Sequence, residues 1–256
     1  MQLKMPFELA ATYKSPSQQA RIISEGWGRE NLYCTRCESP RLEASPPNTR
    51  VVDFICPRCD GCFQLKSQSH PLSLKICDAA YEGMRRAIEE NTAPHLFALH
   101  YDRLHWTVQS LIFIPSFALT LSSLECRKPL GPSARRKGWV GCNILLVNIP
   151  MDARIKVVSD GVPVSPALVR RQYRRFQSLE GMPHETRGWT LDVLQVVRLL
   201  GKTEFSLGEV YRQSDHLQRL HPDNRHVREK IRQQLQRLRD LGVLHFAGSG
   251  EYVVRA

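Results

Sequence analysis

The sequence lacks a long apolar segment. Its longest apolar run, residues 111–124, contains Pro115 and several hydroxyl side chains, and it is shorter than the ~20 residues that a membrane-spanning helix needs. The N-terminal stretch MQLKMPFELAATYKS has no continuous apolar core of signal-peptide length. The lack of a spanning run and of a signal-peptide core predicts a cytoplasmic protein without a membrane partner. Internal repeats and low-complexity tracts are also missing.

Acidic residues are scarce relative to basic ones. The chain has 25 Asp and Glu against 36 Lys and Arg, which gives a formal charge of +11. Residues 124–187 alone contain 12 basic and 5 acidic side chains. A basic excess concentrated in one segment favours a polyanionic partner, and nucleic acid is the first candidate. The alternative is a basic surface that serves only solubility.

The eight cysteines include two pairs with C-x-x-C spacing. Cys34 and Cys37 form one pair, Cys56 and Cys59 the other, and 18 residues separate them. Thiols stay reduced in the cytoplasm, and two tight turns that each supply two thiolates suit tetrahedral zinc, so the spacing predicts a structural zinc site. Cys62 is a possible substitute ligand. The remaining thiols, those of Cys77, Cys126 and Cys142, are predicted to be buried.

Periodicity divides the chain into two parts. Up to about residue 182, the pattern predicts a helix over 15–30, strands over 51–55 and 62–66, a helix over 73–91, strands over 95–102 and 108–116, and a helix over 167–179. From residue 183, three helices, over 189–201, 206–220 and 222–242, precede a hairpin over 243–256. The sequence therefore predicts a mixed α/β domain over 1–182 and a winged helix over 183–256.

The two strands around the second cysteine pair carry a polar pattern. Strand alternation places Gln64 and Lys66 on one face, and a hairpin closed by the cysteine turn would bring Asp53 beside them. Such a group can hold Mg²⁺ through Asp53, the residue 64 side chain and the Leu65 carbonyl, while Lys66 orients water. An exposed Asp and Lys are also common on hairpins that have no catalytic role.

Several longer segments of the sequence resemble those of a known family. The segments ATYKSPSQQARI, VVDF, FQLKS, RKPLGPSARRKGWVGCNI, RGWTLDVL and EKIRQQLQRLRDLG are similar to those of the DpnI-like restriction enzymes. The resemblance implies a PD-(D/E)xK nuclease domain with structural zinc and catalytic Mg²⁺, followed by a winged helix that also reads the site. It also implies a bacterial enzyme that cuts GATC when the adenine is N6-methylated. Asp53 and Lys66 match the motif, whereas Gln64 replaces its acid and Val52 its proline.

Two segments are predicted to contact the DNA. Trp139 is a flat apolar plate for the extra methyl group, beside three cations that can hold phosphates or guanine, Arg135, Arg136 and Lys137. Taken alone, Trp139 could equally be a core aromatic. The last helix has an apolar stripe and a polar side whose candidate contacts are Asn224, Arg225, Arg228, Arg232 and Gln233. A charged helix face is otherwise usually only solvated.

The leading hypothesis is thus a type II restriction endonuclease that acts as a monomer on double-stranded DNA containing N6-methyladenine. A methylated-DNA reader that no longer cuts is the main alternative, because Gln64 removes a charge from the motif. A zinc-ribbon transcription factor would explain the thiolates and the winged helix but leaves Asp53 and Lys66 without a role.

Overall fold

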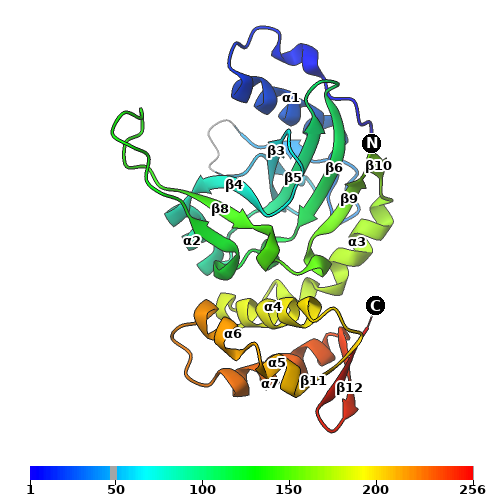
Figure 1. Ribbon diagram of the computed structural model, residues 1–256. Coiled ribbons are helices and arrows are strands. Elements are labelled where there is room, and N and C mark those ends of the chain that lie inside the picture. Colours follow the sequence, from blue (N-terminus) through cyan, green and yellow to red (C-terminus); the bar gives the residue numbers. More distant parts are fainter. Residues whose placement is uncertain (47–50, 256) are drawn as a thin grey trace.

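The computed structural model describes residues 1–46 and 51–255, so Ala256, the last residue of the predicted C-terminal hairpin, lies outside the described residues. The chain forms an upper α/β part and a lower, mainly helical part (Figure 1). Within the described ranges, none of the helices has the length and apolar character needed to cross a bilayer.

A seven-stranded sheet forms the centre of the upper part, in the order β1-β2-β3-β5-β6-β9-β10. Strands β3 and β5 are parallel, and the other neighbours are antiparallel. The continuous apolar run of β5 fits its central position, where both faces are covered. The strand bounds are β1 Glu43–Ala44, β2 Phe54–Ile55, β3 Cys62–Gln68, β5 His95–Asp102, β6 Thr107–Ile114, β9 Ile155–Ser159 and β10 Val162–Pro163.

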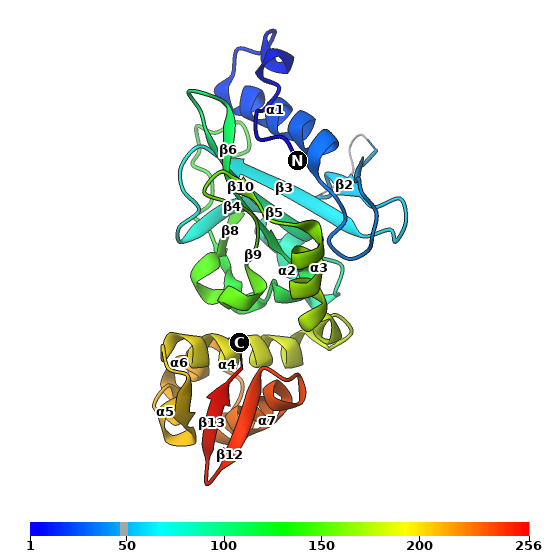
Figure 2. The ribbon, with the colours of Figure 1, turned by 90° about the vertical axis from the view of Figure 1, so that its right-hand side faces the viewer.

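Two helices pack on this sheet. Helix α1 (Pro16–Asn31) begins after Ser15, with proline in its first turn, and buries Ile23 and Trp27 as the periodicity predicts. It lies beside β3 (Figure 2). Helix α3 (Pro166–Arg175) packs against β9. Short 3₁₀ turns complete the part, at Phe7–Ala10, Ser116–Ala118, Leu121–Ser123, Leu146–Asn148, Met151–Ala153 and Gln177–Leu179.

A second sheet corrects the predicted helix over 73–91. Only Tyr81–Glu89 is helical (α2), whereas Lys75–Ala80 is a strand, β4. This strand pairs with β8 (Gly141–Leu145), which pairs in turn with β7 (Leu124–Cys126). The pairing overrides the helical propensity of the alanines, and the alternation of buried Ile76 and Asp78 with exposed neighbours is that of a strand.

The lower part consists of helices and a small sheet that the terminal hairpin forms with a short strand from earlier in the chain. The predicted helix over 206–220 is broken into α5 and α6, and a short strand, β11, precedes them. The mixed α/β class and the C-terminal helical DNA-binding fold predicted from the sequence are confirmed. The bounds are α4 His184–Leu199, β11 Glu204–Ser206, α5 Leu207–Tyr211, α6 Ser214–Leu220, α7 Val227–Asp240, β12 Leu244–Gly248 and β13 Glu251–Val254.

Helix α4 lies between the two parts in both views (Figures 1 and 2). Its Asp192 accepts a hydrogen bond from Ser122 Oγ at 2.6 Å on the upper side. The other oxygen of the same carboxylate lies 2.8 Å from His221 Nε2 on the lower side. Arg198 Nε donates to Asp152 of the upper part at 2.8 Å. Residues 187–197 are all buried, so α4 belongs to the core of both parts.

Candidate active site and DNA interface

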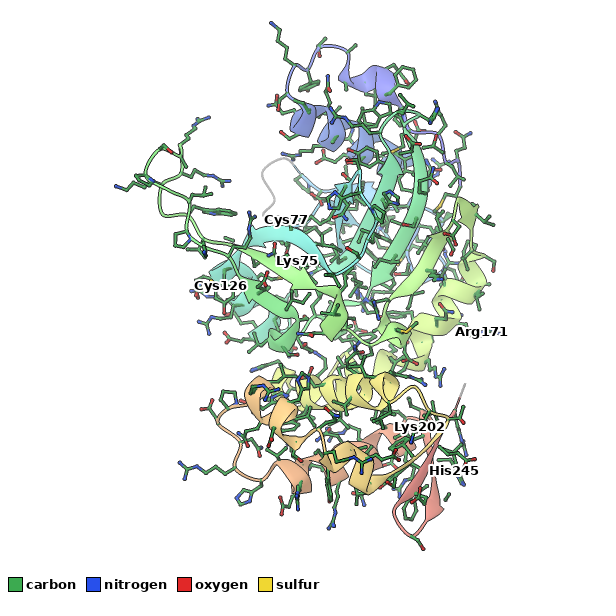
Figure 3. All side chains as sticks on the ribbon, in the orientation of Figure 1. Lys75, Cys77, Cys126, Arg171, Lys202 and His245 are labelled. Carbon is green, nitrogen blue, oxygen red and sulfur yellow. The ribbon has the colours of Figure 1, made fainter. Side chains whose placement is uncertain are left out.

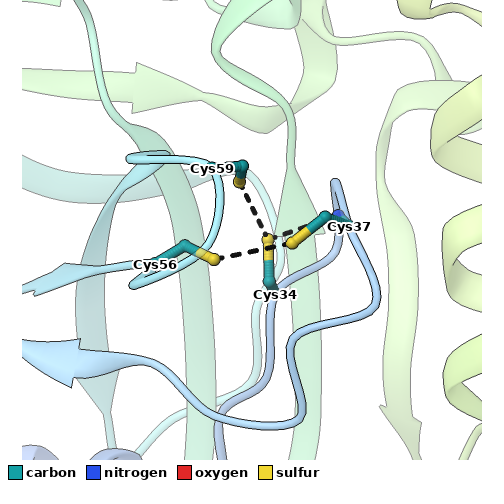
Figure 4. Close-up of side chains that lie close together, drawn as sticks. All are labelled: Cys34, Cys37, Cys56 and Cys59. Atoms are coloured by element: carbon teal, nitrogen blue, oxygen red, sulfur yellow. Dashed lines mark hydrogen bonds between the residues drawn. The ribbon is translucent and has the colours of Figure 1, made fainter.

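The two C-x-x-C turns bring their four sulfur atoms together (Figure 4). All four sulfurs lie within 4.8 Å of one another. Cys34 and Cys59 are 3.6 Å apart, as are Cys37 and Cys56. A tetrahedron of Zn–S bonds has edges of roughly 3.8 Å, so the cluster fits zinc without rearrangement. Cys62 is outside the cluster, and its sulfur faces the Asp60 carbonyl.

Burial and hydrogen bonding act in opposite directions on these thiols. Burial raises the pKa of Cys56, but the amide N–H groups of Arg58 and Cys59 and the thiols of Cys37 and Cys59 together lower it to about 7. At Cys34 and Cys59 burial prevails and raises the pKa. Arg170 of α3 fastens the first turn from outside, because its Nε donates to the Cys34 carbonyl at 3.0 Å and its Nη2 to Ser39 at 3.2 Å. The cluster is closed by four sulfurs, so a metal there would be structural.

Two of the other thiols are not where the sequence analysis placed them. Cys142 is buried, as predicted, but Cys77 and Cys126 are exposed (Figure 3). They lie on the outer strands β4 and β7 of the second sheet, and their side chains point to its solvent face. That sheet was not recognised in the sequence, which is why the prediction was wrong.

The second cysteine turn connects β2 and β3, as the pattern predicts. It brings Asp53 beside β3, the strand that carries Gln64 and Lys66. The Asp53 amide donates to the Phe63 carbonyl at 2.9 Å. The Asp53 carboxylate in turn accepts a hydrogen bond from the Leu65 amide at 2.8 Å. This bond fixes the carboxylate at Leu65, whose neighbours along the strand are Gln64, only 3% exposed, and Lys66, partly exposed.

The Asp53 carboxyl lies in a polar but poorly hydrated setting. Burial raises its pKa above the ordinary value, while the Leu65 amide and the Lys66 charge act in the opposite direction. Helix α1 contributes Glu25, which raises the same pKa, and Arg21, which lowers it. Arg21 and Glu25 also pair with each other at 2.6 Å. A buried carboxylate with so few donors is suited to accept a cation.

The basic segment after β7 forms an arm. Figure 1 shows this loop extending from the second sheet, away from the rest of the molecule. Its two sides are paired, since the Leu130 amide donates to the Trp139 carbonyl and the Arg127 amide to the Gly141 carbonyl, both at 2.9 Å. Arg135, Arg136 and Lys137 are exposed at the tip.

Trp139 lies at the base of this arm and outside the buried core. The guanidinium of Arg136 sits over the indole, 4.5 Å from its centre. On another side the ring packs against Gly141, where a Cβ atom would come within 2.7 Å of the indole. The ring is thus held by its neighbours but remains partly accessible to solvent.

Helix α7 has the two faces that the sequence predicts. Val227, Ile231, Leu235 and Leu238 are buried. The predicted contacts Arg225, Arg228, Arg232 and Gln233 are exposed, and the guanidinium groups of Arg228 and Arg232 flank the ring of Tyr211 at 5.3 and 5.7 Å. Asn224 is half-buried, and its side-chain oxygen accepts the His226 amide at 2.8 Å in the turn before the helix.

Family models account for both parts of the chain. The DpnI model, described as the Dam-replacing family, matches residues 1–182. The chain belongs to the Dam-replacing family. The companion model, described as the Dam-replacing HTH domain, matches residues 185–253, which run from the first turn of α4 to the last residue but one of β13. Family membership suggests a restriction endonuclease that binds DNA through this helix-turn-helix domain.

The sequence analysis missed one polar residue that contacts the site in this member of the Dam-replacing family. Asp78 of β4 lies with its Oδ1 atom 2.8 Å from Lys66 Nζ, and its side chain is fully buried. Neither carboxylate oxygen receives a hydrogen bond of regular geometry from the described residues. The only signal in the sequence was the alternation around Ile76, which the predicted helix concealed.

Proposed function

We propose that this protein is a methyl-directed type II restriction endonuclease. It hydrolyses both strands of double-stranded DNA at GATC sites that contain N6-methyladenine, with Mg²⁺ as cofactor. Residues 1–182 form the PD-(D/E)xK-type cutting domain and residues 183–256 a winged helix that reads the site. The observation that carries the proposal is the Asp53 carboxylate held at the amide of Leu65, the residue between Gln64 and Lys66 in the strand, in a chain of the Dam-replacing family.

The residues at this site fit Mg²⁺, which takes oxygen ligands. Asp53, Gln64 and the Leu65 carbonyl would hold it, and the bound ion would lower the pKa of a coordinated water and shield phosphate charge. Lys66 adds a positive charge next to this position, where it can orient the water or the scissile phosphate. The cysteine cluster would bind Zn²⁺ and fix the hairpin that carries Asp53.

Two exposed basic surfaces supply the DNA contacts in this proposal. The arm cations, Arg135, Arg136 and Lys137, would neutralise phosphates, while Trp139 covers the adenine methyl group. Helix α7 would enter the major groove with its N-terminal end leading. Its contacts would come from Asn224, Arg225, Arg228, Arg232 and Gln233.

The deciding experiment is digestion of one plasmid prepared from an adenine-methylating host and from a non-methylating host. The wild-type protein with Mg²⁺ should cut only the methylated plasmid. Asp53→Ala and Lys66→Ala should each remove cleavage while leaving binding to methylated DNA largely intact, since neither side chain is on the arm or α7. Gln64→Glu should cut at lower Mg²⁺ concentrations, because it adds a charged ligand.

A second function is favoured by one observation, the neutral amide at position 64. An amide oxygen coordinates Mg²⁺ without charge, and this ion dehydrates reluctantly for weak ligands. If the wild-type protein binds methylated GATC tightly yet never nicks it over a wide range of Mg²⁺ and Mn²⁺ concentrations, the protein is a methylated-DNA reader. Cleavage that does not depend on methylation would contradict both functions.

A further inference from the structure

We infer that Asp78 supplies the second negative charge of the metal site, in place of the acid that position 64 lacks. This inference rests on the proposed nuclease function and adds a residue to it. Asp78 comes from β4 in the second sheet, whereas Asp53, Gln64 and Lys66 belong to the β2–β3 hairpin. The site is therefore assembled from both sheets of the upper part.

The first step of the argument is the state of the Asp78 side chain. It is fully buried, and Lys66 Nζ lies 2.8 Å from its Oδ1 atom. No other ion pair involves Asp78 in residues 1–46 and 51–255, and its two oxygens receive no regular hydrogen bond there. A buried carboxylate costs several kcal/mol unless its lone pairs are occupied, so Asp78 retains capacity for a cation.

The second step is the charge of the group. Asp53 and Lys66 cancel, and Gln64 contributes nothing, so the hairpin alone presents no net charge to a divalent cation. With Asp78 the net charge becomes negative by one. A hairpin with an acid at position 64 would carry two carboxylates and one lysine, and so would have this net charge of minus one without Asp78. Asp78 thus restores the electrostatic balance that such a site needs to attract Mg²⁺.

The third step is that Lys66 connects the two carboxylates. Its charge acts on Asp53, and its ammonium contacts Asp78 directly. Two other polar groups close to β4 do not neutralise the Asp78 charge. The buried Cys142 thiol faces the Ala79 carbonyl at 3.3 Å, and the Arg127 guanidinium donates to Cys77 at 2.8 Å. Neither of these is a cation paired with Asp78.

The test is a double-mutant cycle on the full-length, zinc-loaded protein, with the Mg²⁺ concentration for half-maximal cleavage of methylated plasmid as the readout. Asp78→Asn should raise this concentration by about 10- to 100-fold, the usual effect of losing a group that supports a metal site. Adding Gln64→Glu to Asp78→Asn should return it to near the wild-type value. Asp160→Asn, which removes an exposed acid far along the chain, is the matched control and should change nothing.

Mn²⁺ binding, followed by electron paramagnetic resonance without DNA, gives a readout that is independent of cutting. It should weaken in Asp78→Asn and recover in the double variant. The inference is overturned if Asp78→Asn binds and uses the metal as the wild type does, or if Gln64→Glu fails to rescue it, which would leave Asp78 as a purely structural partner of Lys66. If the wild type never cuts, the proposed function fails, and Mn²⁺ binding still decides the role of Asp78.

Discussion

His95 makes the upper part of the molecule sensitive to acid. It lies on β5 directly opposite Phe63 of β3, with its ring 5.1 Å from the Phe63 ring. Its Nδ1 atom accepts a hydrogen bond from the Ser116 amide at 2.9 Å. Burial, with a smaller contribution from Arg36, lowers the pKa of His95 from 6.5 to about 3. Protonation would place an N–H donor on Nδ1 opposite the Ser116 amide in a buried site.

The magnitude follows from linkage. Between pH 6.5 and about 3 the unfolded chain binds a proton at His95 that the folded chain excludes. The free energy of unfolding therefore falls by about 1.4 kcal/mol for each pH unit, which amounts to about 2 kcal/mol by pH 5. This loss is absent above pH 6.5, where both states are neutral.

The variant His95→Asn keeps an acceptor for Ser116 but cannot be protonated. It should be less stable than the wild type at pH 7.5, because the ring leaves a cavity. Urea unfolding with excess zinc, followed by tryptophan fluorescence, should show this difference shrinking by about 2 kcal/mol between pH 7.5 and 5. Loss of zinc at low pH affects both proteins and cancels. A difference that stays constant over this range would refute the assignment of a neutral, buried imidazole.

Three further outcomes are expected. The double substitution Cys34→Ser with Cys37→Ser should abolish stoichiometric zinc binding, measured by atomic absorption. It should also lower the melting temperature and remove cleavage, because structural zinc contributes on the order of 10 kcal/mol to small zinc domains. Normal zinc content and normal cutting would show that the zinc site is elsewhere. Asp53→Asn should melt at a higher temperature than the wild type at pH 7.5 without Mg²⁺, because the raised pKa means that the fold disfavours the charged carboxylate. This gain should vanish below about pH 4, where Asp53 is neutral in both the folded and the unfolded state. An unchanged melting temperature at pH 7.5 would argue against the burial of Asp53. Trp139→Ala should reduce the preference for methylated over unmethylated plasmid by about fivefold, or about 1 kcal/mol. Gly141→Ala should act in the same direction, because its Cβ would lie 2.7 Å from the indole. An unchanged preference in both variants would exclude Trp139 from methyl recognition.

The zinc cluster and the β2–β3 hairpin were predictable because their information is local. Two short turns fix the four sulfurs, and the second turn also fixes the pairing of Phe54 with Phe63. That pairing carries Asp53 to Leu65 without any long-range contact. A pattern read along the sequence is sufficient where the partners are separated by one tight connection.

The second sheet was not predictable in the same way. Strand β4 is followed along the chain by α2, and its alanines and spacing match a helix, so the short alternation around Ile76 is too weak to separate Lys75–Ala80 from the helix that follows. Its partner β8 begins about 60 residues later, after a segment interrupted by proline and arginine. The roles of Asp78 and the exposure of Cys77 and Cys126 depend on this distant pairing.

Helix α4 has a consequence for exchanging parts between relatives of this protein. A break at the family boundary near residue 183 would leave α4 with only one of its two partners. Asp192 would then keep His221 but lose Ser122, and Arg198 would lose Asp152. A chimaera that is to acquire a new DNA preference should therefore inherit α4 together with the surface of the upper part on which it rests. Under the proposed function, the unit to exchange is the outer face of α7 rather than the whole C-terminal segment.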